Sequence, residues 1–187
     1  TWLPWWEAGF QIHIHANGNG AIRTTLDALE TLQQLKPRAD HRTTLQHFGM
    51  ASTESVLRLA RLGGVASVNP SYVYSRSEFN APYVGSDRAY TAARLKTLVD
   101  AGVPTALHAD TPVAPPRPLE EVWIAVNRFG LSGEVRGPEE RINVHEALRM
   151  VTIDAAFSLG VEDNVGSIAA GKYADFAVLE QDPWYLG

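Results

Sequence analysis

A strand followed by a helix recurs four times along the chain, and this repetition constrains the fold more than any other feature. Short apolar and β-branched runs predict strands at residues 10–15, 43–47, 65–68 and 104–108. Apolar residues at helical spacing predict helices near residues 20–35, 52–62, 88–101 and 123–128. Four successive β/α units indicate parallel strands joined by right-handed crossovers. The sequence therefore predicts an α/β domain built on a parallel sheet.

Side chains that bind metals stand at the ends of three of these strands. His15, His47 and Asp110 each close an apolar run and precede a loop. The carboxyl ends of parallel strands meet at one edge, which is where (β/α) barrels place their active sites. Because neighbouring strands lie about 4.8 Å apart, we expect the three side chains to converge on one ion. Converging imidazole and carboxylate ligands are what a hard or borderline divalent metal needs.

Two more histidines flank these positions. His13 shares a strand face with the histidine two residues later, so it contacts substrate, binds the metal as well, or hydrogen-bonds a neighbouring strand or loop. His108 is a metal ligand, a catalytic hydrogen-bond donor to substrate, or a packed residue. Asp110 binds the cation, accepts a proton from water, or caps a turn. His41 precedes a strand and His145 opens a helix, and both are predicted to be non-catalytic.

Two segments depart from the strand and helix rhythm. Residues 69–87 are polar and aromatic, and they are too long for an ordinary connection. We expect a mobile loop that gates the site, with Tyr72 and Tyr74 as substrate-binding residues, or else a packed surface excursion. Asn143 and Glu146 predict a capping box that opens a helix reaching Ala155. A turn-rich stretch then leads to a final strand at residues 176–179.

Composition excludes several classes of function. The net charge is −5 without a basic stripe, so we expect no nucleic-acid partner. No apolar run is long enough to cross a bilayer, so we expect no membrane partner. The chain has no cysteine, which excludes disulfides and thiolate ligands. No signal peptide is visible and the first residue is not Met, so we expect a cytoplasmic protein whose native start lies upstream.

Five segments together resemble the amidohydrolase superfamily, specifically its amidohydrolase-3 (YtcJ-like) group. They are residues 15–19, 41–47, 107–113, 146–156 and 166–179, of which the last is the most specific. The resemblance implies the C-terminal half of a TIM-type (β/α)8 barrel, about four β/α units, at residues 1–160. It also implies that residues 161–187 supply a terminal β-segment to a small β-domain beside the barrel.

The resemblance implies roles for individual residues as well. His15 matches the family's strand-five histidine, His47 its strand-six histidine and Asp110 its strand-eight aspartate, all metal ligands. The strand-one histidine pair and the strand-four lysine or glutamate have no counterpart. The implied reaction is hydrolysis of a non-peptide carbon–nitrogen bond by water activated by one or two divalent ions, with zinc expected. Asp110 would accept the proton, and His47 or His108 would stabilise the oxyanion.

Two other functions remain open. A truncated half-barrel without catalytic activity could self-associate, since four parallel strands leave two edges exposed. A metal-dependent barrel hydrolase could instead act on esters or phosphates. As partners we expect a small-molecule amide substrate, and either further copies of the chain or a missing N-terminal half.

Overall fold

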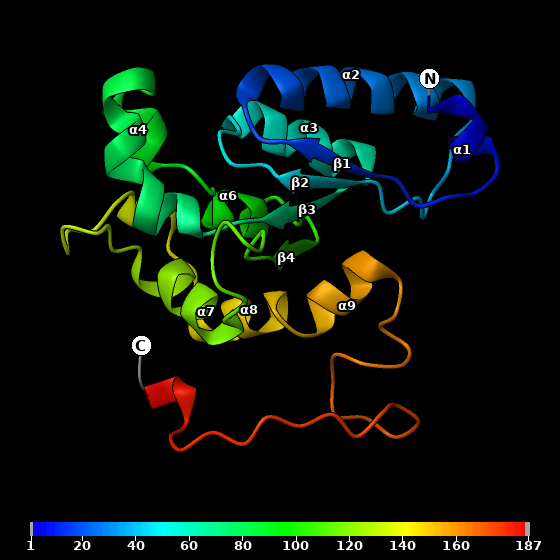
Figure 1. The fold of residues 1–187 in the computed structure, drawn as a ribbon. Helices are drawn as coiled ribbons and strands as arrows, with labels where there is room; N and C mark the ends of the chain where they lie inside the picture. Colours follow the sequence, from blue (N-terminus) through cyan, green and yellow to red (C-terminus); the bar gives the residue numbers. More distant parts are fainter. Residues whose placement is uncertain (1, 186–187) are drawn as a thin grey trace.

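The computed structural model describes residues 2–185 and contains a parallel sheet whose four strands lie in sequence order (Figure 1). The strands are β1 (His13–Ala16), β2 (Thr44–His47), β3 (Val65–Val68) and β4 (Thr105–Leu107). The register aligns Ala16 with His47, His47 with Val68, and Val68 with Leu107. The carboxyl ends of all four strands therefore form one row, and the predicted parallel α/β sheet is confirmed.

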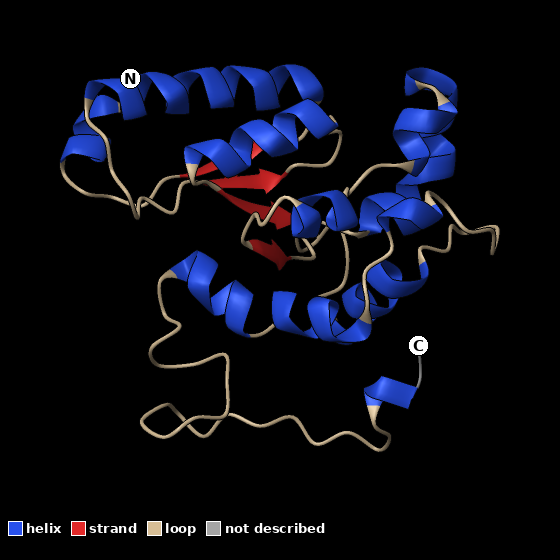
Figure 2. Ribbon diagram, turned by 180° about the vertical axis from the view of Figure 1, so that it is seen from behind, coloured by secondary structure: helices blue, strands red, loops and turns tan. Residues whose placement is uncertain are grey.

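The helices cover one face of the sheet and leave the other open. Figure 2 shows α3 lying across the strands from behind, whereas in Figure 1 β1, β2 and β3 face the viewer. The helical elements are α1 (Leu3–Glu7), α2 (Asn19–Leu35), α3 (Thr53–Leu62), η1 (Tyr72–Arg76), α4 (Ser77–Val84), α5 (Ser86–Tyr90), α6 (Leu95–Asp100), α7 (Pro118–Asn127), η2 (Pro138–Glu140), α8 (Val144–Met150), α9 (Ile153–Leu159) and η3 (Pro183–Tyr185).

The core lies between the sheet and the helices behind it. Leu45 and Ala66 from the strands join one buried cluster with Leu26 of α2 and Leu59 of α3. The side chains that alternate with them point to the open side, where His13 on β1 is exposed and Ser67 on β3 is buried. The open face of the sheet is therefore the polar one, and it carries the candidate site residues.

Several predicted helix boundaries are confirmed. The Asn143 side chain accepts from the backbone N–H of Glu146, and the Glu146 carboxylate accepts from the backbone N–H of Asn143, which is the predicted capping box. α3 ends at Gly63, whose φ of 71° is in the left-handed region that favours glycine. The predicted helix from Asn143 to Ala155 is wrong in one respect, because it breaks at Thr152 into α8 and α9.

The expectation of an irregular loop at residues 69–87 is wrong. The segment forms the π-helix η1, then α4, and it enters α5. Its polar composition hid the helices because α4 has no apolar stripe and exposes Phe79 and Tyr83. Glu78 of α4 instead accepts hydrogen bonds from Ser132 and Arg136, so a distant segment holds the helix in place. The predicted helix 88–101 is likewise two helices, separated at Ala93, where φ is 53°.

The expectation of a final strand at residues 176–179 is also wrong. The segment is an irregular stretch that leads to η3, and it pairs with none of the strands in residues 2–185. A strand forms only where a neighbouring chain supplies the ladder hydrogen bonds. Val178 there is 96% exposed.

Among the described residues, no helix combines the length and apolarity needed to cross a membrane.

Candidate functional site

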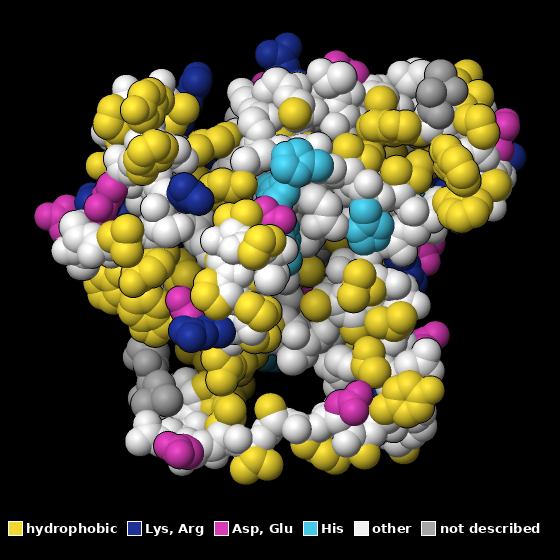
Figure 3. Space-filling view, viewed as in Figure 1, with side chains coloured by type: hydrophobic (Ala, Val, Ile, Leu, Met, Phe, Trp, Pro, Cys, Tyr) yellow, Lys and Arg dark blue, Asp and Glu magenta, His cyan; other side chains and the backbone are white. Residues whose placement is uncertain are grey.

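Three histidines meet along the row of strand ends, and a serine continues the series. His47 Nε2 lies 2.9 Å from His15 Nδ1, and His47 Nδ1 lies 3.2 Å from His108 Nε2. His108 Nδ1 in turn lies 2.8 Å from the hydroxyl of Ser67 on β3. We call these four residues the histidine chain. Figure 3 shows histidine side chains gathered near the middle of the open face, beside an acidic side chain.

The backbone at the end of β2 explains how His47 reaches its neighbours. In a regular strand His47 would point to the same face as the buried Leu45, two residues earlier. His47 and Phe48 instead have φ values of 72° and 47°, in the left-handed region that non-glycine residues rarely adopt. This turn brings the ring of His47 between those of His15 and His108.

Asp110 lies beside the histidine chain, and it too has a left-handed backbone. Its φ is 55°, and its Oδ2 lies 4.0 Å from His47 Nδ1. The side chain is 40% exposed, so water reaches the carboxylate. Clustered strain of this kind points to a functional site, because a residue keeps a costly conformation only where its surroundings enforce it.

Tyr72 also lies near His47. Its ring centroid is 6.2 Å from that of His47, and its hydroxyl accepts a 2.7 Å hydrogen bond from the Asn17 amide. Because the oxygen is the acceptor in that bond, the phenolic proton is available to a substrate. Burial and then the negative charge of Asp110 raise the pKa of Tyr72, so the phenol keeps its proton at neutral pH.

Burial keeps the central histidines neutral. It lowers the pKa of His108 to about 4, with His47 acting in the same direction and Asp110 opposing. Burial also lowers the pKa of His47, against the attraction of Asp110. A neutral imidazole has one nitrogen lone pair, which is what a metal ion binds.

The donor set fits part of a metal site. His15 Nδ1 and His47 Nε2 face each other at 2.9 Å, slightly closer than the roughly 3.3 Å between two nitrogens on a tetrahedral zinc ion. Asp110 faces the other ring nitrogen of His47, so the three predicted ligands lie together without pointing at one atom. Within residues 2–185, no group of three or more acidic or imidazole side chains is arranged to hold a metal. The pair supplies two ligands, and any others must come from elsewhere.

The remaining predicted site residues lie apart from this pair. His13, at the start of β1 and on the same face of the sheet, is hydrogen-bonded to Gln11 and Gln46. Tyr74 packs edge-on against Trp123, with ring centroids 6.0 Å apart. Their predicted contacts with substrate stay predictions.

The two histidines predicted to be non-catalytic lie elsewhere in the fold. His41 is buried, with Nδ1 accepting from the Thr43 N–H and Nε2 at 2.8 Å from the Leu62 carbonyl. Its hydrogen-bonding capacity is thus used within the protein. His145 stacks near Trp184 in the first turn of α8.

Sequence reasoning missed Ser67 and Asn17. One signal was available for Ser67: it is the single polar residue in the buried run Val65–Val68, which is unusual for a strand. Asn17 lies in the segment 15–19 that carries the family resemblance, but its partner is 55 positions away in the chain, so its hydrogen bond to Tyr72 was not predicted.

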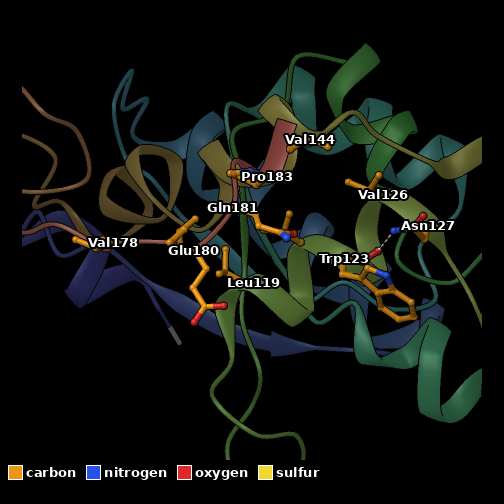
Figure 4. A pocket seen from close by; sticks show the side chains of 11 residues that line it. Leu119, Trp123, Val126, Asn127, Val144, Val178, Glu180, Gln181 and Pro183 are labelled. Carbon is orange, nitrogen blue, oxygen red and sulfur yellow. Dashed lines mark hydrogen bonds between the residues drawn. The ribbon is translucent and has the colours of Figure 1, made fainter. Parts of the chain in front are cut away.

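An apolar cavity elsewhere in the molecule does not contain this site. It measures about 610 Å³ and lies between α7 and the C-terminal segment, as Figure 4 shows. Its walls are mainly apolar, including Leu119, Trp123 and Val126, and Glu180 is the one carboxylate among the lining residues. The cavity therefore lacks the groups that acid–base or metal chemistry requires.

Comparison with known proteins places these features in a family. The model of the amidohydrolase family (Amidohydro_3) matches residues 6–185. The chain is 35% identical to N-substituted formamide deformylase of Arthrobacter pascens over 178 residues, which are 95% of the chain and 33% of that protein. It is 32% identical to the putative amidohydrolase YtcJ of Bacillus subtilis over 184 residues, or 96% of the chain and 34% of that protein.

A solved structure also matches the fold of this chain. The crystal structure of an uncharacterized metal-dependent hydrolase from Pyrococcus furiosus matches with a TM-score of 0.79 and 28% identity, covering 96% of the chain and 35% of that protein. The chain thus spans about a third of the length of these relatives.

Proposed function

Because the chain belongs to the amidohydrolase family, we propose that it forms part of a metal-dependent hydrolase of non-peptide carbon–nitrogen bonds. The observation that carries the proposal is the pair His15 and His47, two imidazole nitrogens 2.9 Å apart at adjacent strand ends, with Asp110 beside them. Neutral imidazole nitrogens next to a carboxylate suit zinc better than a hard ion such as magnesium.

The residues of this chain have distinct tasks in the proposed reaction. His15 Nδ1 and His47 Nε2 hold a divalent cation, which when bound polarises a carbonyl and makes water more acidic. Asp110, 40% exposed and next to His47, accepts the proton of the attacking water and returns it to the leaving nitrogen. Tyr72 donates its hydroxyl proton to the substrate oxygen, held in place by Asn17.

The proposed substrate is a small amide, with an N-substituted formamide first among the candidates. The first relative named above is a deformylase of such compounds. The site lies on an exposed polar face, where a small polar molecule can reach it.

The proposed enzyme also contains more strands than this sheet. Within the described residues, β1 and β4 each pair along one edge only, so both outer edges are open. Further strands there would complete a (β/α)8 barrel, in which the open face becomes the barrel interior. Those strands would bring the additional metal ligands that residues 2–185 do not arrange around the pair.

The test is a hydrolysis assay of this chain together with any upstream sequence that its gene encodes, loaded with zinc. The substrates are an N-substituted formamide, an N-acyl amine, a carboxylic ester and a phosphate ester. We expect the amides to be hydrolysed, and Asp110→Asn to lower kcat by roughly 100-fold or more. Asp163→Asn, an exposed carboxylate elsewhere, is the control. Hydrolysis of the esters alone, or full activity in Asp110→Asn, would contradict the proposal.

A further inference from the structure

We propose that Ser67 is a positioning residue for the candidate metal site. Acting through His108, its hydroxyl determines which ring nitrogen of His47 carries the proton. The consequence for cation binding rests on the function proposed above, whereas the hydrogen-bond chain is independent of that function.

The inference starts from the continuity of the histidine chain. Ser67 Oγ is 2.8 Å from His108 Nδ1, and the opposite nitrogen of that ring is 3.2 Å from His47 Nδ1. The opposite nitrogen of His47 is the one that faces His15. His47 and His108 therefore each use both ring nitrogens, and Ser67 stands at the end farthest from the proposed cation. Ser67 is 6% exposed, which keeps competing water away from its hydroxyl.

Proton counting allows two arrangements of this chain. A neutral imidazole carries one N–H and one lone pair, so every ring that donates at one nitrogen must accept at the other. Either Ser67 donates to His108, which donates to His47, which donates to His15, or every bond runs in the opposite sense. A serine hydroxyl can donate or accept, so it satisfies both arrangements.

Only one of the two hydrogen-bond arrangements is compatible with a cation held by His15 and His47. The cation needs the lone pair of His47 Nε2, so the proton of that ring moves to Nδ1. His47 then donates to His108 Nε2, and His108 carries its own proton on Nδ1. Ser67 becomes the acceptor that satisfies this last N–H. The state that binds the cation therefore depends on an oxygen at position 67.

Replacing the serine isolates this effect. In Ser67→Ala the Nδ1 of His108 loses its partner in a buried position, which penalises the cation-binding tautomer. Ser67→Thr keeps a hydroxyl and is the rescue variant. Ser55→Ala makes the same change at another buried serine, which lies on α3 and whose hydroxyl is hydrogen-bonded to that of the N-cap residue Ser52. It is the matched control, and thermal melting checks that all variants fold.

The experiment uses the chain together with any upstream sequence that its gene encodes. It measures ring ¹⁵N chemical shifts of labelled histidines, with and without zinc, and zinc affinity by calorimetry. In the zinc-bound wild type we expect His47 and His108 protonated on Nδ1. We expect Ser67→Ala to bind zinc about tenfold more weakly, and Ser67→Thr and Ser55→Ala to bind like wild type. Equal zinc affinity in wild type and Ser67→Ala would overturn the proposal.

The metal-free spectra separate this proposal from the function. If the wild type binds no zinc, the proposed metal function of this chain is contradicted. Ser67→Ala must still change the ring shifts of His47, a residue that Ser67 does not contact, if the chain transmits its effect. A shift at His47 supports the positioning role, and unchanged His47 shifts in a folded Ser67→Ala protein overturn it.

Discussion

Individual residues at the site carry strain that the rest of the chain holds in place. His47, Phe48 and Asp110 all have positive φ values without being glycine, at a cost of about 1 kcal/mol or more each. Two of the three are candidate functional residues, and the third directly follows one. Local sequence preferences favour neither left-handed turn, so tertiary contacts impose them.

The buried histidines predict how stability depends on pH. Burial lowers the pKa of His108 from 6.5 to about 4 in the folded protein. Between these values the unfolded chain binds a proton that the folded chain does not, so the free energy of unfolding falls as pH falls from 6.5 to 4. Above pH 6.5 this contribution is fully present. It amounts to about 3 kcal/mol at most.

Urea unfolding at pH 7 and pH 4.5, with chelator present, measures this effect. His108→Gln should lose less stability over that range than the wild type, and His145→Gln, at an exposed site, should lose the same amount. An equal loss in His108→Gln and wild type would show that His108 is not the titrating group.

The close packing around Gly49 predicts a second effect on the free energy of unfolding. A Cβ at this position would lie 2.4 Å from Asn17 Oδ1, and so would push Asn17 away from Tyr72. We expect Gly49→Ala to lower the free energy of unfolding by about 1–3 kcal/mol. Gly20→Ala, where a Cβ meets nothing within 4 Å, should be neutral or stabilising. Thermal melts of the two variants make the comparison, and equal stability would contradict it.

The site could be predicted from the sequence only where strand ends mark it. His15, His47 and Asp110 stand out because each ends an apolar run, and the structure does bring them close together. Ser67 and Asn17 are ordinary residues locally, and their importance comes from partners 41 and 55 positions away. The turn that redirects His47 was likewise invisible to strand alternation.

At the scale of elements, Arg128 joins segments that the sequence suggested were one helix or a loop. It is fully buried and donates to the carbonyls of Tyr90, Ala92, Ala93 and Arg136. Burial lowers the pKa of Arg128 to about 10, so it stays charged at neutral pH. The break between α5 and α6 at Ala93 is thus fixed by a side chain at the end of α7.

Removing the Arg128 side chain should destabilise the segments that its hydrogen bonds connect. We expect Arg128→Ala to cost at least about 3 kcal/mol, because several buried carbonyls lose their donor. Arg117→Ala, whose side chain is 71% exposed, should cost less than about 1 kcal/mol. Denaturant unfolding of both variants tests the difference, and a small effect at Arg128 would mean that water replaces the guanidinium.

Helices and strands could be predicted where the sequence pattern that marks them lies within one short stretch of the chain. The strands and the helices α2 and α3 follow from apolar spacing, and α8 from its capping box. The segment from η1 to α5 was not predictable, because Glu78 holds it through contacts with Ser132 and Arg136. The final strand failed for the opposite reason: its sequence suits a strand, but the described chain offers it no partner.

Over the whole molecule, the C-terminal segment stands out because it exposes large apolar side chains. Ile168 and Val178 in the C-terminal segment are 84% and 96% exposed. We expect the isolated chain to self-associate, and Ile168→Glu with Val178→Glu to reduce the association. Leu35→Glu, at an exposed apolar residue on α2, is the control. Light scattering across a concentration series measures the mass, and a wild-type monomer at every concentration would contradict this expectation.

The proposed function requires that His15 and His47 together hold a divalent cation. The direct test is a calorimetric titration with zinc of the metal-free protein, produced with any upstream sequence that its gene encodes, in parallel for the wild type, His47→Gln and His145→Gln. We expect saturable binding in the wild type and His145→Gln, and at least about tenfold weaker binding in a folded His47→Gln. Undiminished zinc binding in His47→Gln, or none in the wild type, would contradict it.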